Sequence, residues 1–381
     1  MRLSYCTNVH PAEDLDGVIR QLREYAGPVR RRAGLDVLGV GLWLPAGLAG
    51  RLADSDTDLA LLREVLSEEG LQIHTLNAFP YGGFHNEVVK TDVYIPTWAQ
   101  RERLQYTLEC AHVLAALLPD GVPGSISTLP LAWRTPWGRE NDEAAVRAFA
   151  ILSDGLRTLK EYTGKTVRIA VEPEPGCVLD TVSDVTAWLA AGVPRGIDPE
   201  YIGLCVDTCH LAVSFADPAA AVRGIGTAGL RVVKVQASAA LHVSAPSGNS
   251  ARRALEAFAE PRYLHQVREL EPGGTVLMAD DLPQALGELP GRGPWRIHFH
   301  MPLHLVPEPP LETTADVLQA AVAEVSTLPY AEDVHLDIET YTWSVLPGNH
   351  TDLVEGISGE IAWAQSHLLA HARSWPALPQ T

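Results

Sequence analysis

Three apolar segments lie far apart in the chain, and each runs directly into acidic side chains that can bind a metal ion. The segments are 167–171, 201–206 and 334–338, and the side chains that follow them are Glu172, Glu174, Asp207, His210 and Glu339. Apolar runs of this length are typical of buried strands. Carboxylates beside an imidazole suit Mn²⁺, Mg²⁺, Co²⁺ or Zn²⁺, whereas a structural zinc site needs a thiolate cluster that the sequence lacks. We therefore expect a catalytic divalent metal ion as the cofactor.

These side chains can meet only if the strands before them are parallel and lie side by side. That is the geometry of a (β/α)8 barrel, in which the carboxyl ends of all strands share one rim. Strand-like and helix-like segments alternate eight times without an internal repeat, which favours a closed barrel over a doubly wound sheet. The strand segments are 3–7, 37–44, 71–77, 125–128, 167–172, 201–206, 230–236 and 334–339. We predict an α/β fold, a single TIM barrel over residues 1–375.

The seventh and eighth strand segments are separated by about 100 residues, far more than one crossover helix requires. This spacing predicts an insertion at about 240–312. Inside it we expect a helix near 250–258, short strands near 263–267 and 275–278, and then the segment 295–300. The barrel helices are expected at 13–25, 57–69, 97–118, 141–162, 183–190, 217–228, 313–325 and 351–372. A long loop, 79–96, follows the third strand, and such loops are often lids or binding loops.

The composition indicates a globular protein that acts on a small molecule. Of its 381 residues, 46% are hydrophobic and 20% charged, so the chain can bury a sizeable core. The formal net charge of -18 disfavours binding to nucleic acid or anionic lipid. Five cysteines without CxxC spacing indicate buried free thiols in a reducing compartment. Because neither a secretory leader nor a run of about 18 apolar residues is evident, we expect a cytoplasmic protein without an integral membrane segment.

Each acidic candidate also has a structural interpretation. Asp207 could cap a following helix, with His210 packed beneath it. Glu172 and Glu174 flank Pro173 and could form a rigid, solvated turn. Glu339, in contrast, lies among apolar and aromatic neighbours, where a buried carboxylate without a partner is costly. For Glu339 the functional interpretation is favoured.

Three basic candidates, His298, His300 and Lys234, also have both a functional and a structural interpretation. His298 and His300 alternate along an apolar segment of the insertion and share one face, either as a ligand pair or as satisfied core histidines. Lys234, inside the seventh strand, could form a Schiff base, but pairing with a carboxylate is the favoured interpretation.

Residues from loops at the same rim could hold a polyol, or could be structural. They are Asn8, His10, Asn77, His85 and Trp98. The expected substrate-binding set is completed by Glu174, Lys234 and His298.

The strand endings resemble the xylose isomerase-like TIM-barrel superfamily of sugar (phosphate) isomerases and epimerases. In that superfamily a Glu after strand five, an Asp-x-x-His after strand six, a polar ligand after strand seven and a Glu after strand eight surround a metal ion. The matching positions are Glu172, Asp207 with His210, Gln236 and Glu339. Many members carry a histidine where this chain has Gln236, which can coordinate only through its carbonyl oxygen. His300 would otherwise have to reach in from the insertion, so it joins the expected ligand set.

Within that superfamily the chain resembles metabolite-traffic proteins of the EboE type, over almost its whole length. The segments that carry this resemblance are 6–11, 77–81, 89–90 with Tyr94 and Trp98, 263–266, 298–302 and 338–343. The resemblance implies a role in a small-molecule biosynthetic or transport cluster, with pathway proteins as partners. A nuclease relative of the endonuclease IV kind needs further histidines and a basic surface, and neither is evident.

These observations predict a metal-dependent isomerase or epimerase of a sugar-like or cyclitol molecule. Glu172 and Glu339 would contact metal and substrate, and one of them would take a proton from a carbon beside a carbonyl that the ion polarises. His210 would orient a substrate hydroxyl. Two alternatives remain open: a binding or traffic protein that keeps the pocket without turnover, and a metal-dependent hydrolase that uses the ion to make hydroxide.

Overall fold

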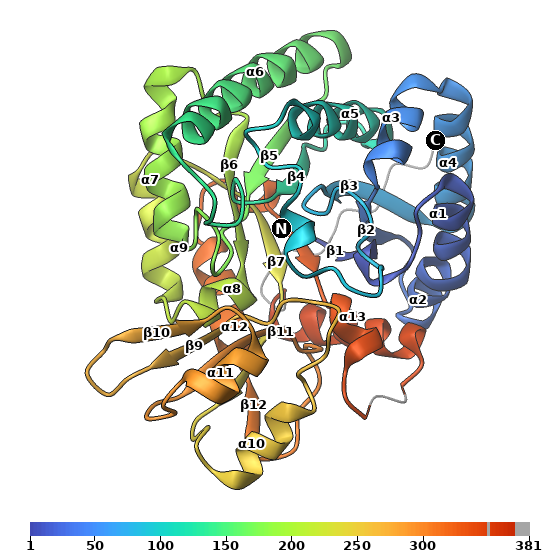
Figure 1. The fold of residues 1–381 in the computed structure, drawn as a ribbon. Coiled ribbons are helices and arrows are strands. Elements are labelled where there is room, and N and C mark those ends of the chain that lie inside the picture. The colour runs from blue at the N-terminus through green and yellow to red at the C-terminus, as the bar shows by residue number, and fades with distance from the viewer. Residues whose placement is uncertain (349–350, 370–381) are drawn as a thin grey trace.

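The computed structural model describes residues 1–348 and 351–369, and its centre is a closed barrel of parallel strands (Figure 1). The strands are β1 (Arg2–Cys6), β2 (Leu38–Trp43), β3 (Leu71–Asn77), β4 (Gly124–Thr128), β5 (Val167–Val171), β6 (Ile202–Asp207), β7 (Val232–Ala237) and β13 (His335–Ile338). Neighbours around the ring follow the order β1-β13-β7-β6-β5-β4-β3-β2. The predicted (β/α)8 barrel is therefore confirmed.

The barrel helices pack their apolar faces against the strands from outside. They are α1 (Leu15–Gln21), α2 (Gly27–Arg32), α3 (Ala46–Asp54), α4 (Asp56–Glu68), α5 (Arg101–Leu117), α6 (Arg139–Thr163), α7 (Val182–Gly192), α8 (Thr208–Val213), α9 (Pro218–Thr227), α12 (Ala315–Val325) and α13 (Leu353–His367). In α4, for example, Leu59, Leu62, Val65 and Leu66 are buried, as expected for a 3.6-residue period. The last residues predicted for the final helix and the barrel, 370–375, lie outside the described part of the chain.

Two barrel helices, α3 and α8, were not predicted. A third was predicted as one continuous helix, but the structure divides it into three parts. Pro45 directly follows the predicted strand 37–44 and is at the same time the N-cap of α3, which begins at Ala46. The short α8 begins directly at the end of β6, within an apolar run too short to reveal a helical period. The helix expected at 13–25 is instead α1 followed by a π-helical turn, Leu22–Ala26, and α2.

The segment between β7 and β13 forms a second sheet with its own hydrophobic core, beside the barrel (Figure 1). Its elements are β8 (Ala240–Val243), α10 (Asn249–Glu256), β9 (Val267–Leu270), β10 (Val276–Ala279), α11 (Leu282–Glu288), β11 (Trp295–His300) and β12 (Leu311–Thr313). The sheet is antiparallel, in the order β10-β9-β11-β8-β12. The strand predicted at 263–267 is wrong in position, since β9 begins at Val267, and β8, β12 and α11 were not predicted.

Strand β11 connects the second sheet to the barrel mouth. Ile297 and Phe299 are buried in the core of the second sheet, so the alternation of the strand places His298 and His300 on its opposite face. The loop 79–96 is tied to the same unit, because the backbone amides of Val89 and Lys90 donate to the carbonyl of Arg262. The Lys90 Nζ also lies 2.6 Å from an Asp281 carboxylate oxygen. The insertion and this loop thus frame one opening.

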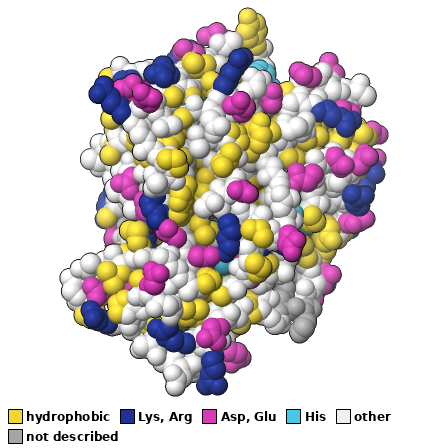
Figure 2. Space-filling view, in the orientation of Figure 1, with side chains coloured by type: hydrophobic (Ala, Val, Ile, Leu, Met, Phe, Trp, Pro, Cys, Tyr) yellow, Lys and Arg dark blue, Asp and Glu magenta, His cyan; other side chains and the backbone are white. Residues whose placement is uncertain are grey.

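Two features of the structure concern nucleic-acid binding and membrane insertion: the distribution of charge on the surface and the character of the helices. On the face shown in Figure 2, lysine and arginine side chains are scattered among acidic ones instead of gathering in one patch. Within residues 1–348 and 351–369, no helix combines the length and apolar character needed to cross a membrane.

Candidate active site

Three carboxylates converge at the carboxyl ends of barrel strands. Glu172 follows β5, Asp207 ends β6 and Glu339 follows β13, and one oxygen of each lies within 4.8 Å of the others. All three are buried, with 3%, 1% and 5% of their surface exposed. Burial, and then the charges of Glu339 and Asp207, raise the pKa of Glu172 well above its ordinary value. Burial and the charge of Asp207 raise the pKa of Glu339 to about 8. Such a site disfavours three negative charges unless a cation joins them.

Asp207 caps a helix with one carboxylate oxygen and keeps the other oxygen available to a ligand. Its Oδ1 accepts hydrogen bonds from the backbone N–H of His210, at 2.8 Å, and from the Ser238 hydroxyl, at 2.9 Å. The first of these bonds caps α8. Its Oδ2 is buried and has no hydrogen-bond partner among the described residues. The capping bond holds the carboxylate in a position that leaves Oδ2 available to a ligand.

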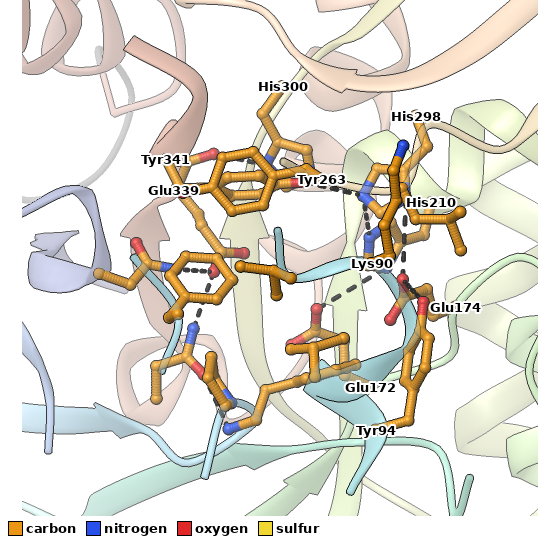
Figure 3. Close-up of a pocket in the computed structure, with 18 residues that line it drawn as sticks. Lys90, Tyr94, Glu172, Glu174, His210, Tyr263, His298, His300, Glu339 and Tyr341 are labelled. Carbon is orange, nitrogen blue, oxygen red and sulfur yellow. Dashed lines mark hydrogen bonds and ion pairs between the residues drawn. The ribbon is translucent and has the colours of Figure 1, made fainter. Parts of the chain in front are cut away.

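Two asparagines hold Glu339. The side-chain amides of Asn8 and Asn77 donate to its Oε1 at 2.8 and 2.7 Å. Figure 3 shows Glu339 on the side of the cavity opposite His210. Glu172 is held more loosely, since its Oε1 lies 3.7 Å from the His210 Nδ1 and its buried Oε2 has no hydrogen-bond partner in the described part of the chain.

Gln236 and His300 each have one buried acceptor atom, and that of His300 lies beside this centre. The Gln236 Oε1 is buried without a hydrogen-bond partner among residues 1–348 and 351–369. The His300 Nδ1 lies 2.6 Å from the backbone oxygen of Glu339, so Nδ1 carries the proton and Nε2 carries a lone pair. That Nε2, again without a hydrogen-bond partner in the described chain, is 3.9 Å from the Asp207 Oδ2.

Four of the five predicted metal ligands carry a buried acceptor that has no hydrogen-bond partner among the described residues. These acceptors are Glu172 Oε2, Asp207 Oδ2, Gln236 Oε1 and His300 Nε2. A buried acceptor without a donor is destabilising, and four together are the arrangement that a cation stabilises. The residues present therefore fit a divalent metal ion, with mainly oxygen ligands and one nitrogen.

A second group adjoins the first and contains His210, His298 and Glu174, whose ligand atoms also lie within 4.8 Å of one another. The His210 Nε2 and His298 Nε2 are 3.0 Å apart (Figure 3). The Glu174 Oε1 accepts a hydrogen bond of 2.6 Å from the Tyr94 hydroxyl. His210 lines the cavity, and its predicted role in orienting a substrate hydroxyl stays a prediction.

The site opens into a small cavity. Its polar lining residues are Asn8, Asn77, Lys90, Glu172, Glu174, His210, His298, His300 and Glu339. Its apolar and aromatic lining residues are Phe79, Pro80, Phe84, Val89, Val93, Tyr94, Tyr263, Leu264 and Tyr341. The loop 79–96 supplies most of the apolar wall, in agreement with its predicted role as a binding loop. An apolar wall with a few convergent polar groups is the usual composition of a small-molecule site.

Of the predicted substrate-binding residues, Asn8, Asn77, Glu174 and His298 line this cavity. Two others are corrected because they pack in the interior. Trp98 is fully buried against Phe149, with ring centroids 4.2 Å apart, and its indole N–H donates to the Thr128 hydroxyl. His10 stacks on Tyr25 at 4.5 Å.

Two further residues of the predicted substrate-binding set, His85 and Lys234, do not line the cavity. The His85 ring lies beside Phe84 and Trp43 and does not line the cavity. The Lys234 Nζ is fully buried, 2.8 Å from the Asp337 Oδ2. Burial lowers the pKa of Lys234, but the negative charge of Asp337 outweighs this and raises the pKa above its ordinary value. Lys234 is therefore a charged partner and not a Schiff-base amine.

Several residues that position the candidate ligands were missed by reasoning from the sequence. Tyr94 and Gln266 hold Glu174 and His298, and Ser238 holds Asp207. Tyr94 and Gln266 lie in segments that carry the family resemblance, which was their one signal. Ser238 had none, because its role depends on the chain bending from β7 toward β6.

Comparisons with known proteins agree with this fold. The family model described as "Xylose isomerase-like TIM barrel" matches residues 30–265. Among curated proteins, none matches this chain. The IOLI protein, whose structure holds a bound zinc atom, is 11% identical with a TM-score of 0.52, over 98% of this chain and 100% of that one. The 3-keto-D-glucoside 4-epimerase YcjR from E. coli is 12% identical, with a TM-score of 0.48 over 96% and 99% of the two chains. An L-ribulose 3-epimerase is 13% identical, with a TM-score of 0.47 over 98% and 99%. At this identity the likeness concerns the fold.

Proposed function

Because the chain belongs to the xylose isomerase-like TIM barrel family, we propose that it is a metal-dependent isomerase or epimerase of a sugar-like or cyclitol molecule. The observation that carries the proposal is a group of buried acceptors that have no hydrogen-bond partner in the described part of the chain: Glu172 Oε2, Asp207 Oδ2, Gln236 Oε1 and His300 Nε2. Glu339 completes the proposed ligand set, since one of its oxygens is already held by two amides.

A divalent ion held by these residues would supply Lewis-acid polarisation of a substrate carbonyl. Glu172 and Glu339 are the proposed bases, because their raised pKa values bring them closer to neutral pH, where a base both accepts and returns a proton efficiently. They follow β5 and β13, strands separated in the ring by β6 and β7. They therefore approach a substrate from two sides, which suits removal of a proton on one face and its return on the other.

The cavity wall supports a substrate of limited size. Phe84, Tyr263 and Tyr341 pack against one another, with ring centroids 4.9–5.4 Å apart, and close one side of the site against water. Asn8 and Asn77 line the same cavity and position Glu339. Excluding water while a carbon carries negative charge prevents side reactions.

The proposal also has a cellular part. It places the protein in the cytoplasm, in the traffic of a small metabolite and beside the other proteins of that pathway, on the basis of the segments that resemble EboE-type proteins. Co-purification of a metabolite with the chain from its native host, identified by mass spectrometry, tests this part.

Exchange of carbon-bound hydrogen tests the chemistry. The metal-loaded protein is incubated in deuterated water with a panel of ketoses, keto-glycosides and keto-cyclitols, and deuterium at carbon is measured by NMR. We expect exchange with at least one of them, and a fall of about 10²–10⁴-fold in Glu172→Gln and Glu339→Gln. Glu161→Gln, an exposed change of the same type on α6, is the matched control.

Two results would contradict the proposal. Binding of a panel member without exchange would identify a binding or traffic protein. Incorporation of ¹⁸O from labelled water into a cleaved product would identify a hydrolase.

A further inference from the structure

We propose that the insertion builds a second metal site, in which His210, His298 and Glu174 bind a cation beside the carboxylate centre. The site joins a barrel residue from α8, a residue that follows β5 and a residue from β11 of the second sheet. All three are buried, and Figure 3 shows them together at one side of the cavity. This inference goes beyond the proposed reaction and does not require it.

The first step concerns the proton of His210. Its Nδ1 lies 2.8 Å from the backbone oxygen of Pro173. A carbonyl oxygen only accepts hydrogen bonds, so Nδ1 carries the ring proton. The Nε2 of the neutral ring is then left with a lone pair.

The same reasoning applies to His298. Its Nδ1 lies 2.6 Å from the Gln266 Oε1. The orientation of that amide is determined by its other end, because the Gln266 Nε2 donates to the backbone oxygen of Pro175 at 2.9 Å and lies 3.3 Å from a Glu174 oxygen. Reversing the amide would place two carbonyl oxygens against each other. The His298 Nδ1 therefore also carries the proton, and its Nε2 a lone pair.

Two lone pairs consequently face each other across 3.0 Å, the distance between His210 Nε2 and His298 Nε2. Without an electrophile between them this contact is repulsive. A metal ion bound to both nitrogens would supply that electrophile. Two tetrahedral ligands about 2.1 Å from a zinc ion lie about 3.4 Å apart, so the two rings need to separate by only a few tenths of an ångström to bind it. Carbonyl oxygens that orient the far nitrogen of each ring are the usual supports of metal-binding histidines.

Glu174 supplies the third ligand and negative charge. Its Oε1 accepts the Tyr94 hydroxyl at 2.6 Å, which fixes the carboxylate beside the two rings. The Tyr341 hydroxyl lies 3.4 Å from the His298 Nε2, at the edge of the same group. Two imidazoles and one carboxylate favour Zn²⁺, whereas the neighbouring oxygen-rich centre favours Mn²⁺ or Mg²⁺.

The insertion serves both centres through one strand. His298 and His300 lie on the same face of β11, and they face His210 and Asp207 respectively. His210 is common to the surroundings of both centres, since its Nδ1 lies 3.7 Å from a Glu172 oxygen. The sites are therefore close enough for two ions to contact one substrate, as in other two-metal enzymes.

Metal stoichiometry tests the proposal. The full-length chain, freed of metal by a chelator, is titrated with Zn²⁺ alone, and bound ions are counted by equilibrium dialysis with plasma mass spectrometry. We expect two ions per chain, and one in His298→Ala. The control His304→Ala, in the same insertion but away from the cavity, keeps two. Glu172→Gln with Asp207→Asn removes the other ion and keeps the one at His298, so failure of this site and failure of the proposed function are distinguishable.

A second measurement does not depend on loss of binding. With Co²⁺ alone, His298→Cys is expected to keep two ions and to gain a thiolate-to-cobalt charge-transfer band. One Zn²⁺ ion in both the wild-type chain and His298→Ala would overturn the proposal. So would a nitrogen-15 NMR spectrum of the Zn²⁺-saturated chain in which His210 carries protons on both ring nitrogens, because a proton would then occupy the place of the metal.

Discussion

The barrel interior contains two polar layers that differ in how their charges are balanced. In the deeper layer, Asp337 accepts from the Ser4 hydroxyl at 2.6 Å and faces the Lys234 ammonium at 2.8 Å. Two residues further along the same strands, Glu339 and Gln236 belong to the layer at the mouth. There, the ion pairs of the three carboxylates within the described chain involve histidines alone. The deeper layer is neutralised by its own side chains, whereas the upper layer keeps buried acceptors that have no donor among the described residues.

This difference teaches how to separate structural from functional polar residues in a buried site. Burial alone does not distinguish them, because both layers are almost fully excluded from solvent. The number of acceptors left without donors does distinguish them. The predictions below test this distinction by changing one layer at a time.

The largest effect is expected in the deeper layer. Lys234→Met leaves the buried Asp337 without its counter-charge, and should lower the free energy of unfolding by roughly 3–5 kcal/mol. The double variant Lys234→Met with Asp337→Asn should recover part of this loss, because the uncompensated charge is removed. Urea unfolding followed by fluorescence measures both. Equal losses in the single and double variants would show that packing, and not charge balance, holds this layer.

In the upper layer, removing a charge should raise the free energy of unfolding instead of lowering it. In the metal-free chain, Glu339→Gln removes one of three mutually repelling carboxylates while its Oε1 still accepts from Asn8 and Asn77. We expect an increase of roughly 1–2 kcal/mol in the free energy of unfolding, as when other active-site residues that oppose folding are replaced. The same variant should lose the stabilisation that added Mn²⁺ gives the wild-type chain. Destabilisation of the metal-free variant would contradict the comparison.

The pH dependence follows from the raised pKa of Glu339, about 8 when folded against an ordinary value of 4.5. Below pH 4.5 the carboxyl is protonated in both states and contributes no pH dependence. Between pH 4.5 and 8 the folded chain binds the proton more tightly, so the stability of the metal-free chain falls as pH rises, by roughly 1 kcal/mol or more. Unfolding of wild type and Glu339→Gln from pH 5 to pH 8 measures this, and the variant should show a smaller slope. If the stability of both proteins changed equally with pH, groups other than Glu339 would be responsible for the pH dependence.

The smallest effect is expected at a corrected residue. Trp98→Phe loses the hydrogen bond to Thr128 and should cost about 1 kcal/mol of stability, while metal affinity changes less than twofold. Calorimetric titration with Mn²⁺ measures the affinity. A tenfold or larger loss of Mn²⁺ affinity would show that Trp98 does contribute to the site.

The barrel and its acidic rim could be predicted because both depend on local patterns. Apolar runs mark the strands, and a carboxylate directly after a buried strand lies at the rim of any parallel barrel. Hence Glu172, Asp207 and Glu339 were found together as candidates. Trp98 and His10 were misassigned because an aromatic residue in a loop at the rim has the same sequence pattern whether it lines the cavity or packs behind it.

The second sheet was harder to predict, because its strands are short and pair across long loops. The strand β8 pairs with β11, more than fifty positions away, and only this pairing aims His298 and His300 at the barrel mouth.

The sequence by itself therefore determined the alternation of strands and helices, the family and the acidic residues at the strand ends. The tertiary structure decided which nitrogen of each histidine carries the proton, which partner Lys234 has, and that the insertion places two histidines beside His210 and Asp207. The physical reason is that hydrogen-bond donors and acceptors are properties of neighbours in space. A lone pair becomes available to a metal only when the rest of its ring is held by a group from elsewhere in the chain.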